Sequence, residues 1–315
     1  MEILEQSGKP DLAEIFVARM RPDPLSLVEF VDAVDPRYPR QEKWVVTVST
    51  QFGCPVQCLF CDSGGFYAGN LTADEILAEI DHVVRRRAPG GRIGASKFKI
   101  HFARMGEPSL NPAVLDVLER LPLIYDAPGL MPCIPTVAPR SAGAFFERLL
   151  EVKRRLYAQG RFQLQFSVNS TDEGTRDRIM PIRKWTLAEI GEYACRWYEP
   201  GDRKVVLNFA LSPANVVEAG RIAGHFDPRF SMIKVTPVNP TDMAQRNGFD
   251  TVLSAANPRA ADRLAGELAG LGFDCVVSIG EEEEIEIGSN CGQAATRIVR
   301  GRLHAERREE HRGLP

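Results

Sequence analysis

The sequence predicts an α/β protein whose core is a partial (β/α)6 barrel. Six short apolar runs alternate with segments of helical period between residues 44 and 300. That order produces right-handed β-α-β units and a parallel sheet. Six strands are fewer than the eight that close a complete barrel. We therefore expect an open barrel domain over 44–300, preceded by a small N-terminal extension over 1–43.

The predicted strands and helices follow one another in a regular order. The strand runs are WVVTVST at 44–50, FKIHF at 98–102, LMPCIP at 130–135, LQFSV at 164–168, VVLNFAL at 205–211 and MIKVTPV at 232–238. After the first strand, Thr72 and Glu75 form a capping box, and Ile76, Ile80 and Val83 continue as one apolar stripe. Further helices are predicted at 113–121, 142–156, 187–198, 216–226 and 258–271.

Both ends of the chain carry weaker patterns. Residues 13–20 and 25–34 surround the turn-like RPDP, which is consistent with a β-hairpin whose second arm is a strand or a helix. Near the other end, 274–279 and 284–287 are predicted as a strand pair that closes one edge of the sheet. The tail over 301–315 is charged, so we expect it to be exposed.

Composition is that of an ordinary globular protein, with 44% hydrophobic and 26% charged residues. No apolar run approaches the ~20 residues of a membrane-spanning helix, and the acidic start MEILEQ lacks the pattern of a secretory signal. We therefore expect a cytoplasmic protein with no membrane partner. The net charge of −3 argues against a nucleic-acid partner, because proteins that hold a phosphate backbone usually carry a basic excess.

Three of the seven cysteines lie within eight residues, directly after the first predicted strand. Cys54, Cys58 and Cys61 therefore occupy a loop at the C-terminal end of that strand, where barrel enzymes place their chemistry. Iron–sulfur clusters are held by thiolates, so these cysteines match three irons of a 4Fe-4S cluster and leave the fourth iron open. A structural zinc is the alternative, but zinc takes four protein ligands and no second CxxC or HxxxH pair has a suitable spacing.

An open iron can bind the amino and carboxylate groups of S-adenosylmethionine (SAM). One-electron reduction of the bound sulfonium then yields a 5′-deoxyadenosyl radical. The CxxxCxxC spacing, with the aromatic Phe60 directly before Cys61, resembles the signature of radical SAM enzymes. The cofactors implied are a 4Fe-4S cluster and SAM, and the implied protein partner is an electron donor such as flavodoxin or ferredoxin.

A more specific resemblance covers residues 44–295. The segments QFGCPVQCLFCDSGGFYAGNLTADEI, MGEPSLN, FSVNSTDEGTRDRIMPI, VNP and NCGQ occur in the order found in the RlmN and Cfr family of radical SAM RNA adenosine methyltransferases. Any one of these motifs alone is weak, but their number and order make the resemblance specific. The fold that it implies is the partial (β/α)6 barrel of the radical SAM type.

The resemblance also implies a set of SAM contacts at successive strand ends. Gly106, Glu107 and Pro108 correspond to the segment that receives the SAM amino group. Ser167 and Asn169 correspond to the family's Ser-x-His pair, with Asn in place of His, and Asn239 to an Asn near the adenosyl group. The alternatives are structural: Ser167 and Asn169 could cap a helix that begins near Thr171, and Asn239 with Pro240 could form only a turn.

Cys291 and Thr47 bear on the methyl-transfer chemistry that the resemblance implies. In the family, the CGQ cysteine carries a methyl group whose methylene radical adds to an sp2 carbon, and a second cysteine takes part in product release. Cys291 matches the carrier, but the position seven before Cys54 is Thr47. A hydroxyl cannot form the disulfide that expels the product. Cys133, on the third strand, could point into the same barrel, although a strand cysteine is more often a small buried hydrophobe.

Two further features argue against ribosomal RNA as the substrate. The 43 residues before Trp44 are too few for the family's N-terminal RNA-binding domain, and the stretch before Cys291 reads GEEEEIEIGSN. We therefore expect methyl or methylene transfer through Cys291 to a small-molecule or other non-ribosomal substrate. The alternatives are direct hydrogen abstraction from a small molecule, giving epimerisation, dehydrogenation or rearrangement, and an rRNA or tRNA adenosine methyltransferase. An iron–sulfur sensor would have no need of a SAM site.

Overall fold

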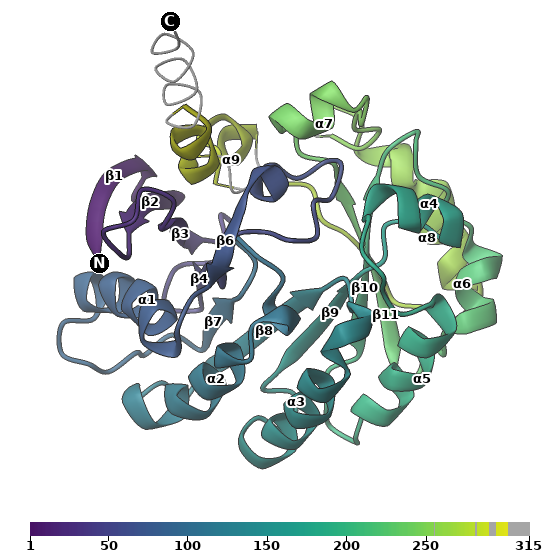
Figure 1. Ribbon diagram of the computed structural model, residues 1–315. Helices are drawn as coiled ribbons and strands as arrows, with labels where there is room; N and C mark the ends of the chain where they lie inside the picture. The colour runs from purple at the N-terminus through teal and green to yellow at the C-terminus, as the bar shows by residue number, and fades with distance from the viewer. Residues whose placement is uncertain (255, 281, 290–293, 302–315) are drawn as a thin grey trace, which may run out of the picture.

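A ten-stranded sheet forms the core of the protein. The computed structural model describes residues 1–254, 256–280, 282–289 and 294–301. In spatial order the strands are β1 (Glu2–Lys9), β2 (Ala13–Arg19), β3 (Leu27–Val34), β4 (Lys43–Thr47), β7 (Lys97–His101), β8 (Leu130–Thr136), β9 (Gln163–Ser167), β10 (Val205–Leu211), β11 (Ser231–Pro237) and β12 (Cys275–Val277). The sheet curves around an interior without closing on itself (Figure 1).

In the spatial order β4, β7, β8, β9, β10, β11 and β12, each strand is parallel to the next. The six strands predicted from the sequence are β4, β7, β8, β9, β10 and β11, each within one or a few residues of its expected bounds. The prediction of a partial (β/α)6 barrel is therefore confirmed. Because every strand runs the same way, the loops that follow them gather at one end of the barrel.

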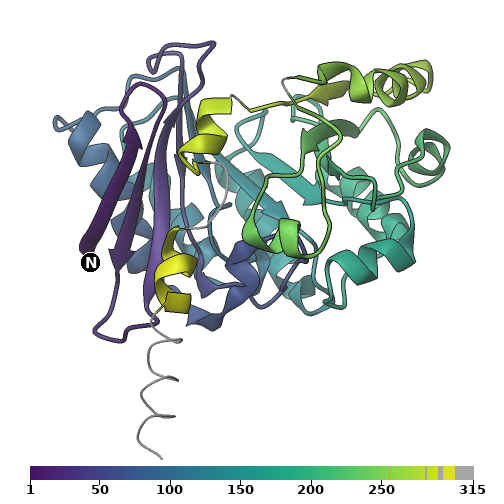
Figure 2. The ribbon, with the colours of Figure 1, turned by 90° about the horizontal axis from the view of Figure 1, so that it is seen from above.

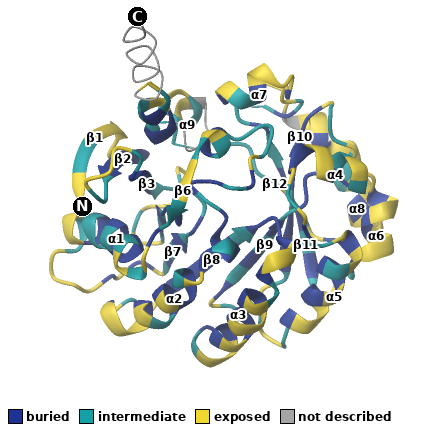
Figure 3. Ribbon diagram, in the orientation of Figure 1, coloured by how far each residue is buried: buried dark blue, intermediate teal, exposed yellow. Residues whose placement is uncertain are grey.

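Helices cover the outer face of the sheet, as Figures 1 and 3 show. They are α1 (Ala73–Arg87), α2 (Ala113–Ile124), α3 (Gly143–Leu156), α5 (Leu187–Trp197), α6 (Ala219–His225) and α8 (Asp262–Gly270). The predicted capping box of Thr72 and Glu75 is present at the start of α1. No helix in the described part of the chain is long and apolar enough to span a membrane.

Along the strands, apolar side chains that face the core alternate with polar side chains that face the barrel interior. On β7, Phe98 and Ile100 join the hydrophobic core beneath the helices. A strand places successive side chains on opposite faces, so Lys97, Lys99 and His101 face the interior. The interior is accordingly lined by polar side chains, which suits a binding site rather than a packed core.

The N-terminal extension is larger than a hairpin. β2 and β3 form the expected antiparallel hairpin, and its second arm is a strand. β1 adds a third antiparallel strand that the sequence pattern did not reveal. β3 also pairs antiparallel with β4, so the extension continues the barrel sheet.

One predicted element near the C-terminus is wrong. The first arm of the expected strand pair is β12, which lies parallel to β11. The second arm, over 284–287, is instead part of a short helix, α9 (Glu282–Glu286). Glutamate favours helix and is depleted in strands, so a run of glutamates cannot form the expected edge strand easily. The predicted exposed tail from 302 to 315 lies outside the described residues.

Candidate active site

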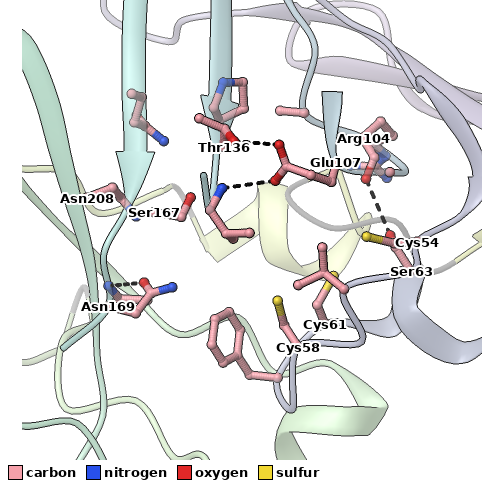
Figure 4. A pocket seen from close by; sticks show the side chains of 18 of the residues that line it. Cys54, Cys58, Cys61, Ser63, Arg104, Glu107, Thr136, Ser167, Asn169 and Asn208 are labelled. Atoms are coloured by element: carbon pink, nitrogen blue, oxygen red, sulfur yellow. Dashed lines mark hydrogen bonds between the residues drawn. The ribbon is translucent and has the colours of Figure 1, made fainter. Parts of the chain in front are cut away.

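A cavity of about 290 Å³ opens at the C-terminal ends of the parallel strands. All three signature cysteines line it, as do side chains that follow β7, β8, β9, β10 and β11 (Figure 4). We call it the cysteine cavity. Glu107, Ser167, Asn169 and Asn239 also lie on its wall. The structure therefore brings together the candidate residues that lie in its described part.

The cysteine loop is held in place from a distant part of the chain. It follows β5 (Gln51–Gly53), which pairs with β6 (Tyr67–Asn70), and it contacts the short helix α7 (Asp242–Arg246). The hydroxyl of Thr241 donates to the carbonyl of Phe60 at 2.9 Å, and the Asn247 amide donates to the carbonyl of Leu59 at 2.7 Å. These two bonds join residues that are 181 and 188 positions apart in the sequence. They hold the loop in place without a cofactor.

The environment of the three thiols fits an iron–sulfur cluster. Cys54 is buried, Cys58 and Cys61 are half-buried, and all three face the cavity (Figure 4). Burial raises the pKa of each thiol, and for Cys54 and Cys58 the neighbouring thiols add to the effect. Three thiolates are therefore stable here only with a cation between them. Among the described residues, no three His, Cys, Asp or Glu side chains form a group that could hold a single metal ion.

Gly106 shapes the loop that carries Glu107. Its φ of +101° lies in the region that favours glycine, and a Cβ atom there would lie 2.7 Å from side-chain atoms of Thr50 and Gln51. The tight approach lets the Glu107 N–H donate to the Gln51 side chain at 2.8 Å. Glycine is therefore required for the loop to reach the cavity wall.

Glu107 is a buried carboxylate without an ion pair among the described residues. Oε1 accepts hydrogen bonds from the hydroxyls of Ser109, at 2.7 Å, and Thr136, at 2.5 Å, and Oε2 accepts one from the Val137 N–H at 2.9 Å. Burial raises the pKa of Glu107, and these hydrogen bonds oppose the shift. Oε2 keeps acceptor capacity on an oxygen that can bond twice. A cationic ligand would neutralise this charge.

Ser167 and Asn169 do not cap the following helix. That helix, α4 (Glu173–Ile179), is capped by Asp172, which accepts from the Thr175 N–H at 2.8 Å. Asn169 has a φ of +61°, which Asn tolerates better than most residues, and its Oδ1 accepts from the Ala210 N–H at 3.2 Å. The Ser167 hydroxyl has no hydrogen-bond partner among the described residues. The capping interpretation is therefore wrong.

A buried ion pair that the sequence pattern did not reveal lies beside the cavity. Arg104, just before Gly106, pairs with Glu29 of β3, and the two side chains are 2% and 0% exposed. Arg104 also donates to the carbonyls of Gly288, at 2.9 Å, and Ser289. Glu29 accepts from the Ala295 N–H at 3.0 Å. Cys291 lies outside the described residues, but the chain on both sides of it is bound to this pair.

A second cavity, of about 470 Å³, lies in the barrel interior next to the first. We call it the lumen cavity. Thr47 lines it, so the position that holds a second cysteine in the family faces this space. Cys133 is buried on β8 opposite His101, but it is not among the described residues that line either cavity. His101 and Asn208 line both cavities and connect them.

The Glu29–Arg104 pair generates a stability prediction. Replacing Arg104 by Met leaves Glu29 buried and unpaired, which we expect to lower the free energy of unfolding by about 3–5 kcal/mol. The double variant Arg104→Met, Glu29→Gln should recover much of the loss, because no buried charge remains. Urea denaturation measures both. A double variant no more stable than the single one would contradict this reading.

Comparison with known proteins places the chain in a family. No family model matches it. A probable dual-specificity RNA methyltransferase RlmN from Desulfitobacterium hafniense strain Y51 is 31% identical over 268 residues, which are 82% of this chain and 69% of the relative. The RlmN of Anaeromyxobacter dehalogenans is 28% identical, over 82% of this chain and 67% of its own.

A solved structure agrees on the fold. A radical SAM methyltransferase from Sphaerobacter thermophilus superposes with a TM-score of 0.70 at 22% identity, covering 93% of this chain and 81% of that one. The family resemblance of the motifs is thus confirmed by sequence over most of the chain. The chain belongs to the RlmN family of radical SAM methyltransferases, enzymes that use a 4Fe-4S cluster and SAM.

Proposed function

We propose that Cys54, Cys58 and Cys61 hold the 4Fe-4S cluster and that SAM binds beside it in the cysteine cavity. The observation that carries the proposal is the buried carboxylate of Glu107, which has no ion pair among the described residues and lies on the wall that the three thiols share. SAM carries an ammonium and a sulfonium group, so it brings the positive charge that this wall lacks. When bound, the cluster supplies the electron that cleaves SAM to methionine and a 5′-deoxyadenosyl radical.

The side chains of this protein then have distinct binding roles. Glu107 accepts from the SAM amino group through the remaining capacity of Oε2, while Thr136 and Val137 keep the carboxylate oriented. The Ser167 hydroxyl has no hydrogen-bond partner among the described residues. Together with Asn169, it binds the ribose or the carboxylate of SAM. Asn239 lies near the adenosyl group. An external electron donor such as flavodoxin or ferredoxin is required, because no residue of the chain supplies the reducing electron.

Cys291 is proposed as the methyl carrier. Its neighbour Ser289 is bonded to Arg104, whose own side chain lines the cysteine cavity. Cys291 is two residues from Ser289 in the sequence, and two residues of extended chain span up to about 7 Å, so the anchor at Arg104 supports a role near that cavity. On the C-terminal side of Cys291, the Ala295 N–H donates a hydrogen bond to Glu29, which anchors the chain there as well. These anchors support a carrier thiol that works next to SAM.

The proposed acceptor is an sp2 carbon of a small-molecule or other non-ribosomal substrate. Thr47 on the lumen cavity cannot supply the thiol that releases product in the family. Glu284 of α9 lines the same cavity and would repel a polyphosphate backbone. An RNA adenosine methyltransferase is the second candidate, because both named relatives are described as RNA methyltransferases.

Glu107→Gln tests the SAM site. The amide keeps an acceptor for Ser109 and Thr136 but removes the charge, so we expect SAM affinity to fall about ten- to a hundredfold, the value of a charge-assisted hydrogen bond. Calorimetry on the reconstituted protein measures the affinity. Glu147→Gln, on the exposed face of α3, is the control and should bind SAM as the wild type does. Equal affinity for the two variants would remove Glu107 from the SAM site.

Labelled SAM tests the role of Cys291. After incubation of reconstituted protein with methyl-labelled SAM, mass spectrometry should find S-methylcysteine in the peptide that contains Cys291. Cys291→Ala should lose the label yet still form 5′-deoxyadenosine, and Cys275→Ala on β12 should keep both. An unmethylated Cys291 in active protein would instead favour direct hydrogen abstraction.

Ribosomal RNA tests the substrate proposal. We expect no gain of methylated adenosine in large-subunit rRNA when the gene is expressed in a strain that lacks RlmN, because Thr47 removes the releasing thiol. Mass spectrometry of digested rRNA measures this, with an authentic RlmN as the positive control. Methylation at the adenosine that RlmN modifies would establish the RNA candidate.

A further inference from the structure

Lysines converge in the barrel interior below the cysteine cavity. Lys43 begins β4, Lys97 and Lys99 lie on β7, and Lys234 lies on β11, all on faces that alternate with core residues. Parallel pairing places Lys43 directly opposite Lys97. Of these four, Lys43 and Lys234 line the lumen cavity, and the charge of Lys99 acts on Lys234 from nearby.

Lys234 and Lys99 have no counter-charge in the described structure. Neither forms a hydrogen bond or an ion pair with a described residue. Lys43 differs, because it pairs with Asp35, which also binds Arg37 at 3.0 Å. Burial, followed by the charges of Lys99 and Lys43, lowers the pKa of Lys234. Both lysines are half-buried, so each ammonium gives up part of its contact with water without gaining a counter-charge from a described residue.

The polar groups around Lys234 are also incompletely bonded. Lys234 lines the lumen cavity together with His101 and Asn208. His101 Nε2 and Asn208 Oδ1 are buried atoms with no hydrogen-bond partner among the described residues. Burial, with the charges of Lys99 and Lys234, lowers the pKa of His101 well below its ordinary value, so the ring is neutral and offers one N–H donor. Ammonium groups and ring donors facing one cavity are the groups that bind oxyanions.

We propose that the lumen cavity binds a small-molecule substrate by an oxyanion, a phosphate or a carboxylate, held by Lys234 and His101, which both line that cavity. The inference rests on the proposed function, since it places the substrate anion in the interior and the reacting carbon toward SAM. His101 and Asn208, which line both cavities, lie between the two ends of such a molecule. The anion supplies the counter-charge that Lys234 lacks.

The dimensions of the cavity favour a small molecule over a nucleic acid. Its volume of about 470 Å³ is in the range of sites for small ligands. Lys234 lies within β11 rather than at an end of the strand. A phosphodiester that reached it would have to bring the nucleic-acid chain on both sides of the phosphate into the cavity. Asp35 and Glu284 on the cavity wall would add repulsion along that path.

Anion binding to the reconstituted full chain tests this proposal. Inorganic phosphate and acetate, titrated separately by calorimetry, are the probes for the two oxyanions. We expect the wild type to bind at least one of them and Lys234→Met to bind it at least about tenfold more weakly, the value of a hydrogen bond to a charged group. Lys204→Met is the matched control, because Lys204 pairs with Asp274 outside the barrel, and it should bind as the wild type does.

Folding of the variant is controlled by thermal unfolding. Lys234→Met removes a half-buried charge that has no ion pair among the described residues, so its melting temperature should not fall, and the stabilisation that phosphate or acetate gives the wild type should be lost. Lys234→Arg should retain part of the binding. Absence of binding of both anions by the wild type, or equal binding by Lys234→Met, overturns the proposal. Calorimetric binding of SAM to the wild type is a separate titration, so failure of the SAM site is distinguishable from failure of the anion site.

Discussion

The buried ion pair between Glu29 and Arg104 is the interaction on which the arrangement of the site depends. It joins β3 of the N-terminal extension to the loop that carries Gly106 and Glu107. Through Gly288 and Ala295 it also holds the chain on either side of Cys291. A charge pair that is almost fully excluded from water is stable only when both partners and their remaining hydrogen bonds are in place. The extension, the loop that carries Glu107 and the C-terminal segment are therefore positioned together.

The two cavities differ in the charges that face them. The cysteine cavity carries the carboxylate of Glu107 and three thiols, whose charged forms burial disfavours. The lumen cavity carries Lys234, which has no ion pair among the described residues, next to a neutral His101, while Asp35 and Glu284 lie elsewhere on its wall. A cationic cofactor at one end and an anionic substrate group at the other would each relieve a local charge. Opposite charges would also fix which end of the substrate approaches SAM.

Much of the fold was predictable because it follows from local patterns. Alternating strand and helix periods gave the six parallel strands, and the capping box at Thr72 marked α1 correctly. Contiguous motifs gave the cysteine loop and the Gly106 to Pro108 segment. β1 was not predictable, since EILEQSGK has few apolar residues. A strand was wrongly predicted in the region of α9, because Ile285 and Ile287 alternate with glutamates there.

The remaining parts of the site depend on tertiary contacts. Glu29 and Arg104 are 75 residues apart, and neither lies in a pattern that pairs them. The acceptor role of Glu107 toward Thr136 and the convergence of Lys99 with Lys234 arise only when strands far apart in sequence curve around one interior. Alternation predicts which face a lysine takes, but not what lies opposite it.

The most direct test of the central claim is reductive cleavage of SAM by the reconstituted protein. With a strong reductant, the wild type and Cys195→Ala, whose cysteine is exposed on α5, should hold a cluster and form 5′-deoxyadenosine. Replacing Cys54, Cys58 or Cys61 by Ala should abolish both the visible absorption of the cluster and the formation of 5′-deoxyadenosine. Cleavage of SAM at the wild-type rate by a variant that lacks all three cysteines would contradict the account.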